Sequence, residues 1–150
     1  MKRILPQANS LSTVIKTFIY CSNRDNYSKK EVADFCGYQP RQADYYINAC
    51  HYIGLLDNNG CCSMIGRDII SGDYATIKIR TYELILQDEF IGKIFTKLVL
   101  YSENEARKYA IEYVNKHYPQ YGEAVVNRRA SCIVGWCIEI LDYIRTNLKI

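Results

Sequence analysis

A stretch near residue 45 carries side chains that could read DNA bases. Its candidates are Arg41, Gln42, Tyr45 and Asn48. Arginine bonds to guanine edges, glutamine and asparagine bond to adenine edges, and arginine and tyrosine also hold phosphates. Spacings of four and three residues place Arg41, Tyr45 and Asn48 on one face of a helix. The pattern predicts a DNA-reading face, although Asp44 opposes tight contact and an ordinary solvated helix face has the same composition.

A second stretch, close to residue 130, has a similar chemical character. It contains Asn127, Arg128, Arg129 and Ser131, and adjacent arginines near the start of a long helix can contact phosphates and guanine. We expect Asn127, Arg128 and Ser131 to point away from the buried face, with Arg129 at its flank. The alternative is that the arginines form salt bridges with neighbouring acids such as Glu123. Of these two interpretations, the sequence favours DNA contact.

Two further basic residues would extend these faces. Lys29 opens a short helix, and Arg67 follows a turn at the place where a wing is expected. Lysine and arginine at such positions contact the phosphate backbone, which positions a protein on DNA without reading its sequence. We therefore add both residues to the candidate DNA-binding set.

The elements that must position these residues are organised around a repeated pattern. Tyr-Ser-x-x-Glu occurs twice, in YSKKE at residues 27–31 and in YSENE at residues 101–105. A serine followed three residues later by glutamate is a capping box, in which each side chain accepts a hydrogen bond from the other residue's backbone N–H. An amphipathic helix precedes each box, and a turn with another amphipathic helix follows it. The sequence therefore predicts two similar modules, over residues 1–80 and 81–150.

The first module is expected to be a helix-turn-helix with a wing. Its helices are predicted over residues 11–22, from Lys29 to Gly37 and from Pro40 to about Leu56. The turn DNNG and the run CCSMIGRDII, residues 57–70, then predict a small strand pair. Residues 72–87 are ambiguous, and we favour a strand followed by a helix.

The second module follows the same order. Helices are predicted over residues 88–101, from Ser102 to about Pro119, and over about 123–144. The fold class predicted for the chain is thus mainly α with small β-wings, arranged as two tandem winged-helix (helix-turn-helix) modules.

Two phrases of the sequence resemble parts of known proteins. GLLDNNGCCSMIGRDII, residues 54–70, resembles the junction between the third helix and the wing of winged-helix proteins, although the usual threonine is absent beside Ile65 and Gly66. VNRRAS, residues 126–131, with Trp136 after it, resembles the tandem winged-helix modules found with or fused to bacterial restriction endonucleases. The resemblance implies binding of double-stranded DNA in a restriction or mobile-element system, with a separate nuclease or regulatory protein as partner.

No recognisable catalytic pattern accompanies these residues. The sequence lacks the Glu-x-Lys of many metal-dependent nucleases, the G-x-x-x-x-G-K-[ST] phosphate loop and the G-x-S-x-G elbow. Cys50 and His51 are neighbours, but adjacent helical residues point about 100° apart and do not form a ready nucleophile and base. The sequence predicts a non-catalytic protein without a cofactor.

Composition and charge restrict the class of protein further. A net charge of +3, from 19 basic and 16 acidic residues, permits nucleic-acid binding without demonstrating it. Seven cysteines in no paired framework indicate reduced thiols and a cytoplasmic protein, and His51 and His117 have no metal-ligand spacing to them. No apolar stretch is long enough to span a membrane.

A second interpretation of the same composition is a winged-helix module that binds other proteins. Fourteen tyrosines and a second half with balanced charge favour it, because tyrosine suits contact surfaces and a fold does not determine a function. Such a module could serve as a regulatory or adaptor subunit, and it could form an oligomer.

Overall fold

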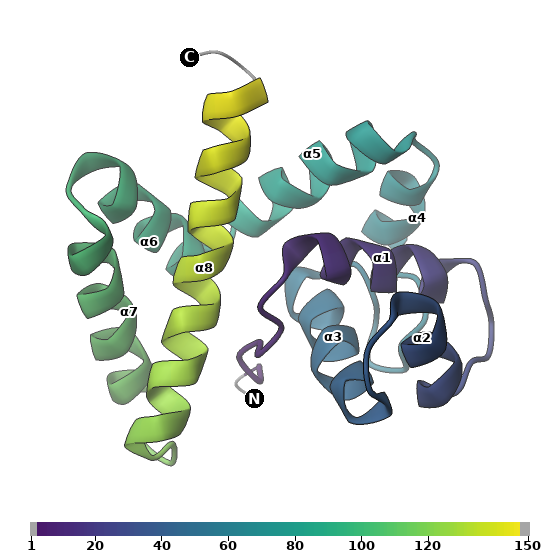
Figure 1. The fold of residues 1–150 in the computed structure, drawn as a ribbon, viewed down its shortest axis with the longest axis horizontal. Coiled ribbons are helices and arrows are strands. Elements are labelled where there is room, and N and C mark those ends of the chain that lie inside the picture. Colours follow the sequence, from purple (N-terminus) through teal and green to yellow (C-terminus); the bar gives the residue numbers. More distant parts are fainter. Residues whose placement is uncertain (1–2, 148–150) are drawn as a thin grey trace. The chain divides into compact units, whose positions relative to one another are not determined.

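The computed structural model describes residues 3–147 and divides the chain into two units, Met1–Leu84 and Ile85–Ile150 (Figure 1). The helices are α1 Leu11–Ser22, α2 Lys29–Cys36, α3 Pro40–Ile53, α4 Met64–Ile70, α5 Tyr74–Leu86, α6 Glu89–Leu100, α7 Glu103–His117 and α8 Glu123–Asn147. The only β-pairing in residues 3–147 is an isolated antiparallel bridge between Leu56 and Cys62. The predicted β-wings are therefore wrong: the fold is all-helical.

In the first unit, α1, α2 and α3 pack against one another (Figure 1). Helix α1 begins where Ser10 accepts a hydrogen bond from the backbone N–H of Thr13, and it buries Val14, Ile15 and Phe18 completely. These three apolar residues recur at helical spacing, so a single face of α1 meets both neighbouring helices.

The start of α2 is the predicted capping box. The Ser28 hydroxyl accepts from the Glu31 N–H at 3.1 Å, and the Glu31 carboxylate accepts from the Ser28 N–H at 3.1 Å. The helix ends at Gly37, whose φ of 81° is a left-handed conformation that favours glycine. Both ends of α2 are thus determined by residues within or next to the helix.

Replacing Ser28 by alanine is expected to destabilise the first unit by about 1 kcal/mol, because the backbone N–H of Glu31 loses the hydroxyl that accepts its hydrogen bond. The measurement is the free energy of unfolding from urea denaturation followed by circular dichroism. Lys30→Ala, an exposed change in the same turn, is the control and should have little effect. Equal stabilities of the two variants would contradict the role given to the cap.

A three-residue turn joins α2 to α3. Pro40 occupies the first position of α3, and the Gln42 side chain accepts from the Gln39 N–H at 3.3 Å. Within the turn, the Tyr38 ring stacks on Tyr46 with centroids 4.9 Å apart, and its hydroxyl lies 3.0 Å from that of Thr17. These contacts fasten the turn to α1 and α3 and set the position at which α3 begins.

A helix, α4, occupies the region in which a wing was predicted. After the Leu56–Cys62 bridge, the Ser63 hydroxyl accepts from the Gly66 N–H at 2.9 Å and starts α4. A Cβ atom at Gly66 would lie 2.3 Å from the Leu55 carbonyl oxygen, so the missing side chain lets α4 approach the end of α3 closely. The glycine that resembled part of a wing junction serves helix packing instead.

The predicted strand in residues 72–87 is also wrong. Asp73 accepts from the backbone N–H of Thr76 at 2.8 Å, and the chain continues as the single helix α5. The alternation in YATIKIR is too short to specify a strand, and the local cap favours a helix. Hydrogen bonds from Thr76 also lower the pKa of the Asp73 carboxyl group below its usual value.

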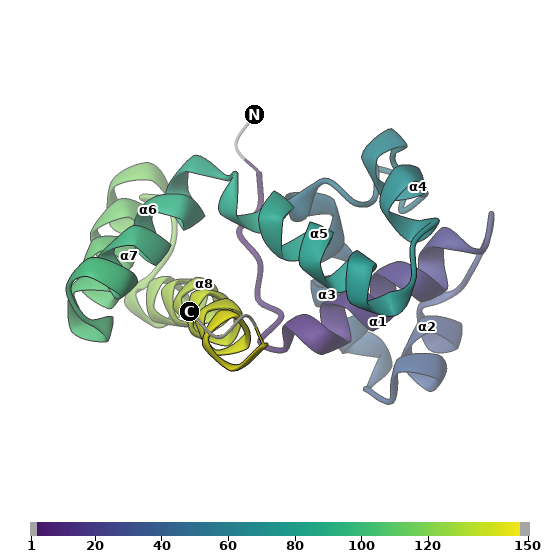
Figure 2. The same cartoon turned by 90° about the horizontal axis from the view of Figure 1, so that it is seen from above.

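In the second unit, α6, α7 and α8 pack pairwise, as two views of the ribbon show (Figures 1 and 2). Ser102 caps α7 by accepting from the Glu105 N–H at 3.1 Å. The buried face of α8 includes Val126, Ala130, Ile133, Cys137 and Ile140, with Trp136 also fully buried. Each unit therefore contains a helix, a serine-capped helix and a further helix that packs on both.

Candidate functional site

The amino-terminal half of α3 is an exposed polar surface in the first unit. Arg41, Gln42 and Tyr45 are all exposed there, Tyr45 with 39% of its surface accessible. They lie directly after the turn between α2 and α3, as in the recognition helix of a helix-turn-helix. Gln42 also closes the start of the helix through its bond to the Gln39 N–H, so its amide has a structural role.

The carboxyl-terminal half of α3 is covered by the first residues of the chain. The Asn48 amide donates to the Ile4 carbonyl oxygen at 3.3 Å. Arg3 donates to the Tyr52 carbonyl oxygen at 2.8 Å and places its guanidinium 4.1 Å from the Tyr52 ring, leaving Tyr52 only 4% exposed. Asn48 therefore holds the amino-terminal segment, and the candidate surface is shorter than the sequence pattern indicated.

An ion pair crosses from α2 to the candidate surface. The Lys29 ammonium lies 2.9 Å from a carboxylate oxygen of Asp44, and both side chains are more than half exposed. An exposed pair of this kind contributes at most about 1 kcal/mol. Lys29 thus offsets the negative charge of Asp44, while Lys30 and Arg41 remain exposed.

Arg67 is exposed in the middle of α4. It was predicted to lie at a wing, and because the described residues contain no wing, that position is wrong. The structure places Arg67 on a helix that packs against α1.

The second candidate cluster lies in the second turn of α8. Asn127 and Arg128 are exposed, and Arg128 has no ion-pair partner in the described part of the chain. Ser131 is exposed too, but its hydroxyl accepts from Arg107 of α7 at 2.8 Å. The other nitrogen of that guanidinium lies 3.4 Å from Glu103. Arg128 is therefore the cation of this cluster best placed for a phosphate.

Arg129 is less exposed than Arg128. It is half-buried, and its guanidinium lies 5.7 Å from the centre of the Tyr121 ring. Cation–π contacts at such distances contribute about 0.5–1 kcal/mol at exposed sites. Arg129 thus helps to hold the loop before α8 against the helix.

Cys50 and His51, which are neighbours in the sequence, bond to different backbone carbonyl groups rather than to each other. The Cys50 thiol donates to the Val14 carbonyl oxygen at 3.4 Å, while the His51 ring lies 3.1 Å from the Leu56 carbonyl oxygen. Burial raises the pKa of Cys50 well above its usual value, and raises that of Cys21 to about 11. These two thiols stay protonated at neutral pH, and thiols are poor nucleophiles compared with thiolates.

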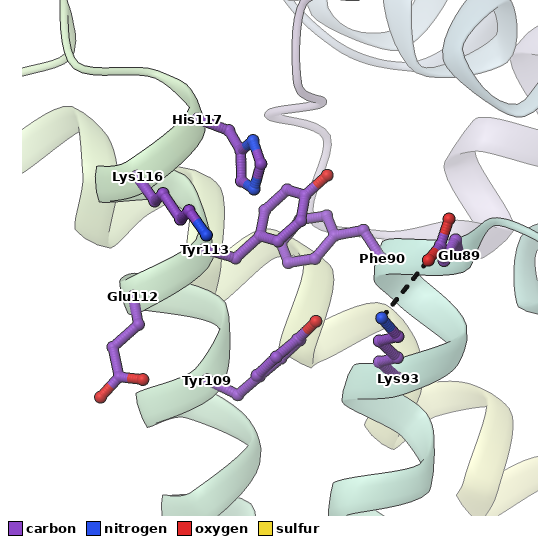
Figure 3. A pocket seen from close by; sticks show the side chains of 8 residues that line it. All are labelled: Glu89, Phe90, Lys93, Tyr109, Glu112, Tyr113, Lys116 and His117. Carbon is purple, nitrogen blue, oxygen red and sulfur yellow. Dashed lines mark hydrogen bonds and ion pairs between the residues drawn. The ribbon is translucent and has the colours of Figure 1, made fainter.

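The second unit contains a pocket of about 470 Å³ between α6 and α7 (Figure 3). Its lining residues are Glu89, Phe90, Lys93, Tyr109, Glu112, Tyr113, Lys116 and His117. The sequence interpretation missed this site. The signal was the spacing of Tyr109, Tyr113 and His117, which recur every fourth residue and so share one face of α7. The spacing indicates a shared face but does not reveal that α6 leaves a space beside it.

Comparison with known proteins gives a family without an assigned activity. No curated protein matches the chain, and no solved structure matches it. A family model described as a domain of unknown function, DUF7226, matches residues 13–145. Because the match covers well over half of the chain, the protein belongs to the DUF7226 family.

Proposed function

We propose that this protein is a non-catalytic, double-stranded DNA-binding protein that contacts DNA through α2, the following turn and the start of α3. The observation that carries the proposal is the exposure of Arg41, Gln42 and Tyr45 at the amino-terminal end of α3. In helix-turn-helix proteins this end of the second helix enters the major groove, and the preceding helix crosses the backbone.

The chemistry of the two helices supports this orientation. Arg41 can form paired hydrogen bonds to guanine, and Tyr45 can reach a phosphate or the edge of a base. Lys29 and Lys30 lie at the amino-terminal end of α2, where the backbone N–H groups and the helix dipole also favour an anion. Asp44 weakens the attraction, so we expect moderate affinity with a strong dependence on salt.

The wider setting follows from the sequence resemblance alone. We propose a restriction or related mobile-element system, in which a separate nuclease or regulatory protein acts with this chain. The proposed compartment is the cytoplasm, and the seven free cysteines support it, since disulfides are uncommon there. None of the helices in residues 3–147 is long and apolar enough to cross a membrane.

The test is fluorescence anisotropy with a labelled duplex of mixed sequence at two salt concentrations, about 50 and 200 mM. We expect the affinity to fall steeply as salt is added. Binding releases counterions from the DNA, and that release is less favourable at a higher salt concentration. Arg41→Ala should weaken binding by about 1–3 kcal/mol, as for loss of a paired contact to guanine. No binding at the lower salt concentration would overturn the proposal.

Two variants in the same unit make the test specific to the proposed surface. Lys16→Ala removes an exposed positive charge from α1, and it should leave the affinity almost unchanged. Asp44→Asn removes the opposing negative charge and should tighten binding. Equal losses of DNA affinity in Arg41→Ala and Lys16→Ala would show that the affinity depends only on the net charge of the protein.

The α8 cluster requires its own variant pair. Arg128→Ala removes an exposed guanidinium, whereas Arg129→Ala also removes a contact with Tyr121. If the second unit also binds DNA, Arg128→Ala alone should weaken binding. Undiminished affinity in the Arg128→Ala, Arg129→Ala double variant would restrict the DNA contact to the first unit.

A protein-binding role is the second candidate, and one observation favours it. Val99, Leu100 and Tyr101 are consecutive exposed apolar residues at the end of α6, with Leu100 66% exposed. Exposed apolar groups gathered in one place are typical of protein contact sites. Retention of a protein partner without DNA, and its loss in Leu100→Ser, would support this role.

A further inference from the structure

We propose that the pocket between α6 and α7 binds a small anionic molecule with a planar ring, of the mononucleotide class. All of the residues that line the pocket belong to the second unit, whereas the α3 surface belongs to the first. The proposal is therefore independent of DNA binding by the first unit. Its volume of about 470 Å³ is in the range of sites for small organic ligands, roughly 300–1,000 Å³.

Stacked aromatic rings form one wall of the pocket. The centroids of Phe90 and Tyr113 are 3.9 Å apart with the planes nearly parallel, and those of Tyr113 and His117 are 4.2 Å apart with the planes tilted by 34°. Phe90 is almost completely buried beneath them. Tyr109 projects its hydroxyl toward α6 across the space (Figure 3). A planar ligand can extend this set of rings, because bases stack on aromatic side chains.

The charged groups around the rings favour an anionic ligand. In Figure 3 the ammonium of Lys116 is directed toward Tyr113, whereas the carboxylate of Glu112 is turned away from the rings. Lys116 has no ion-pair partner among the residues that the structure describes. An ammonium beside an aromatic wall suits a phosphate or carboxylate joined to a ring.

A second ammonium is available on the opposite side of the pocket. Lys93 lies 3.3 Å from Glu89, one helical turn earlier in α6, and the Glu89 side chain is 86% exposed. An exposed ion pair between residues four apart on a helix is weak, so a ligand phosphate can compete with Glu89 for Lys93. The pocket thus combines a stacking wall with two cations on different helices.

The test is calorimetric titration of the full chain with adenosine 5′-monophosphate, adenosine and inorganic phosphate in separate experiments. We expect saturable binding of the monophosphate at one site, at least ten-fold tighter than either fragment. Adenosine binding as tightly as the monophosphate would overturn the anionic half of the proposal. Equal binding of phosphate alone would overturn the stacking half, and no saturable binding of the monophosphate would overturn both.

Charge variants locate the site. Lys116→Ala should weaken binding about ten-fold, as expected for a lost hydrogen bond between charged groups. Lys108→Ala makes the same change on an exposed part of α7 that does not line the pocket, and it should have no effect. Glu89→Gln frees Lys93 and should tighten binding several-fold. Unchanged affinity in both Lys116→Ala and Glu89→Gln would overturn the assignment to this pocket.

Discussion

Replacing Trp136 by alanine is expected to lower the free energy of unfolding of the second unit by about 3–5 kcal/mol. Trp136 is the largest of the fully buried side chains and has no exposed surface. It lies on α8 between Ile133 and Ile140, which are also fully buried. Truncation leaves a cavity that neighbouring helices can fill only partly, and small domains have only about 5–15 kcal/mol of stability in total.

The measurement is chemical denaturation followed by far-ultraviolet circular dichroism, because Trp136 is the only tryptophan and its fluorescence is lost in the variant. Tyr101→Ala is the control: Tyr101 is 69% exposed, so its loss should cost less than about 1 kcal/mol. If both variants lost a similar amount of unfolding free energy, the central position of Trp136 in the core would be contradicted.

The second large effect is expected for Gly66→Ala in the first unit, with a loss of about 1–3 kcal/mol. The added Cβ atom would lie 2.3 Å from the Leu55 carbonyl oxygen and 3.0 Å from the Cys62 sulfur. The Leu55 oxygen also accepts from the backbone N–H of Ser63 at 3.0 Å, and the Ser63 hydroxyl, which donates to the Gly54 carbonyl oxygen, shares its hydrogen with Leu55 at 3.0 Å. The backbone cannot move away from the new methyl group without stretching these bonds.

Gly135→Ala is a control that should change the stability in the opposite direction. Gly135 lies inside α8, and a Cβ atom there would meet nothing within 4 Å. Alanine should therefore stabilise α8 by about 1 kcal/mol through its higher helix propensity. Thermal unfolding of the two variants followed by circular dichroism gives the comparison. Stabilisation by both substitutions would contradict the close approach of α4 to Leu55.

Local sequence signals predicted the helix ends because each depends on a few adjacent atoms. Ser28 and Glu31 form the expected reciprocal bonds, Pro40 occupies the first position of α3, and Gly37 ends α2 in a left-handed conformation. Such caps act over four or five residues and are the same in most tertiary contexts. The helices α1 to α3 of the first unit and α6 to α8 of the second, with most of their buried faces, were for this reason accessible from the sequence.

The wing prediction was wrong because the same residues suit two structures until their surroundings are known. Ser63 can end a strand or cap a helix, and Gly66 can form a wing turn or a helix contact. The Ser63 hydroxyl donates to the Gly54 carbonyl oxygen at 2.6 Å, and Gly66 lies against Leu55. Contacts with the end of α3 therefore select the helix, and a pattern within residues 60–70 alone contains no information about them.

The sequence by itself determined the helical spacing, the caps, the mild positive charge and the exposed polar types near residues 41 and 128. Only the tertiary structure decided which of those polar residues remain accessible. Asn48 is bound by the chain's own first residues, and Ser131 is bound by Arg107 of the neighbouring helix. It also decided that the rings of α7 face a space beside α6. Periodicity specifies the direction of a side chain on its own helix, whereas accessibility depends on segments distant in sequence that pack over it.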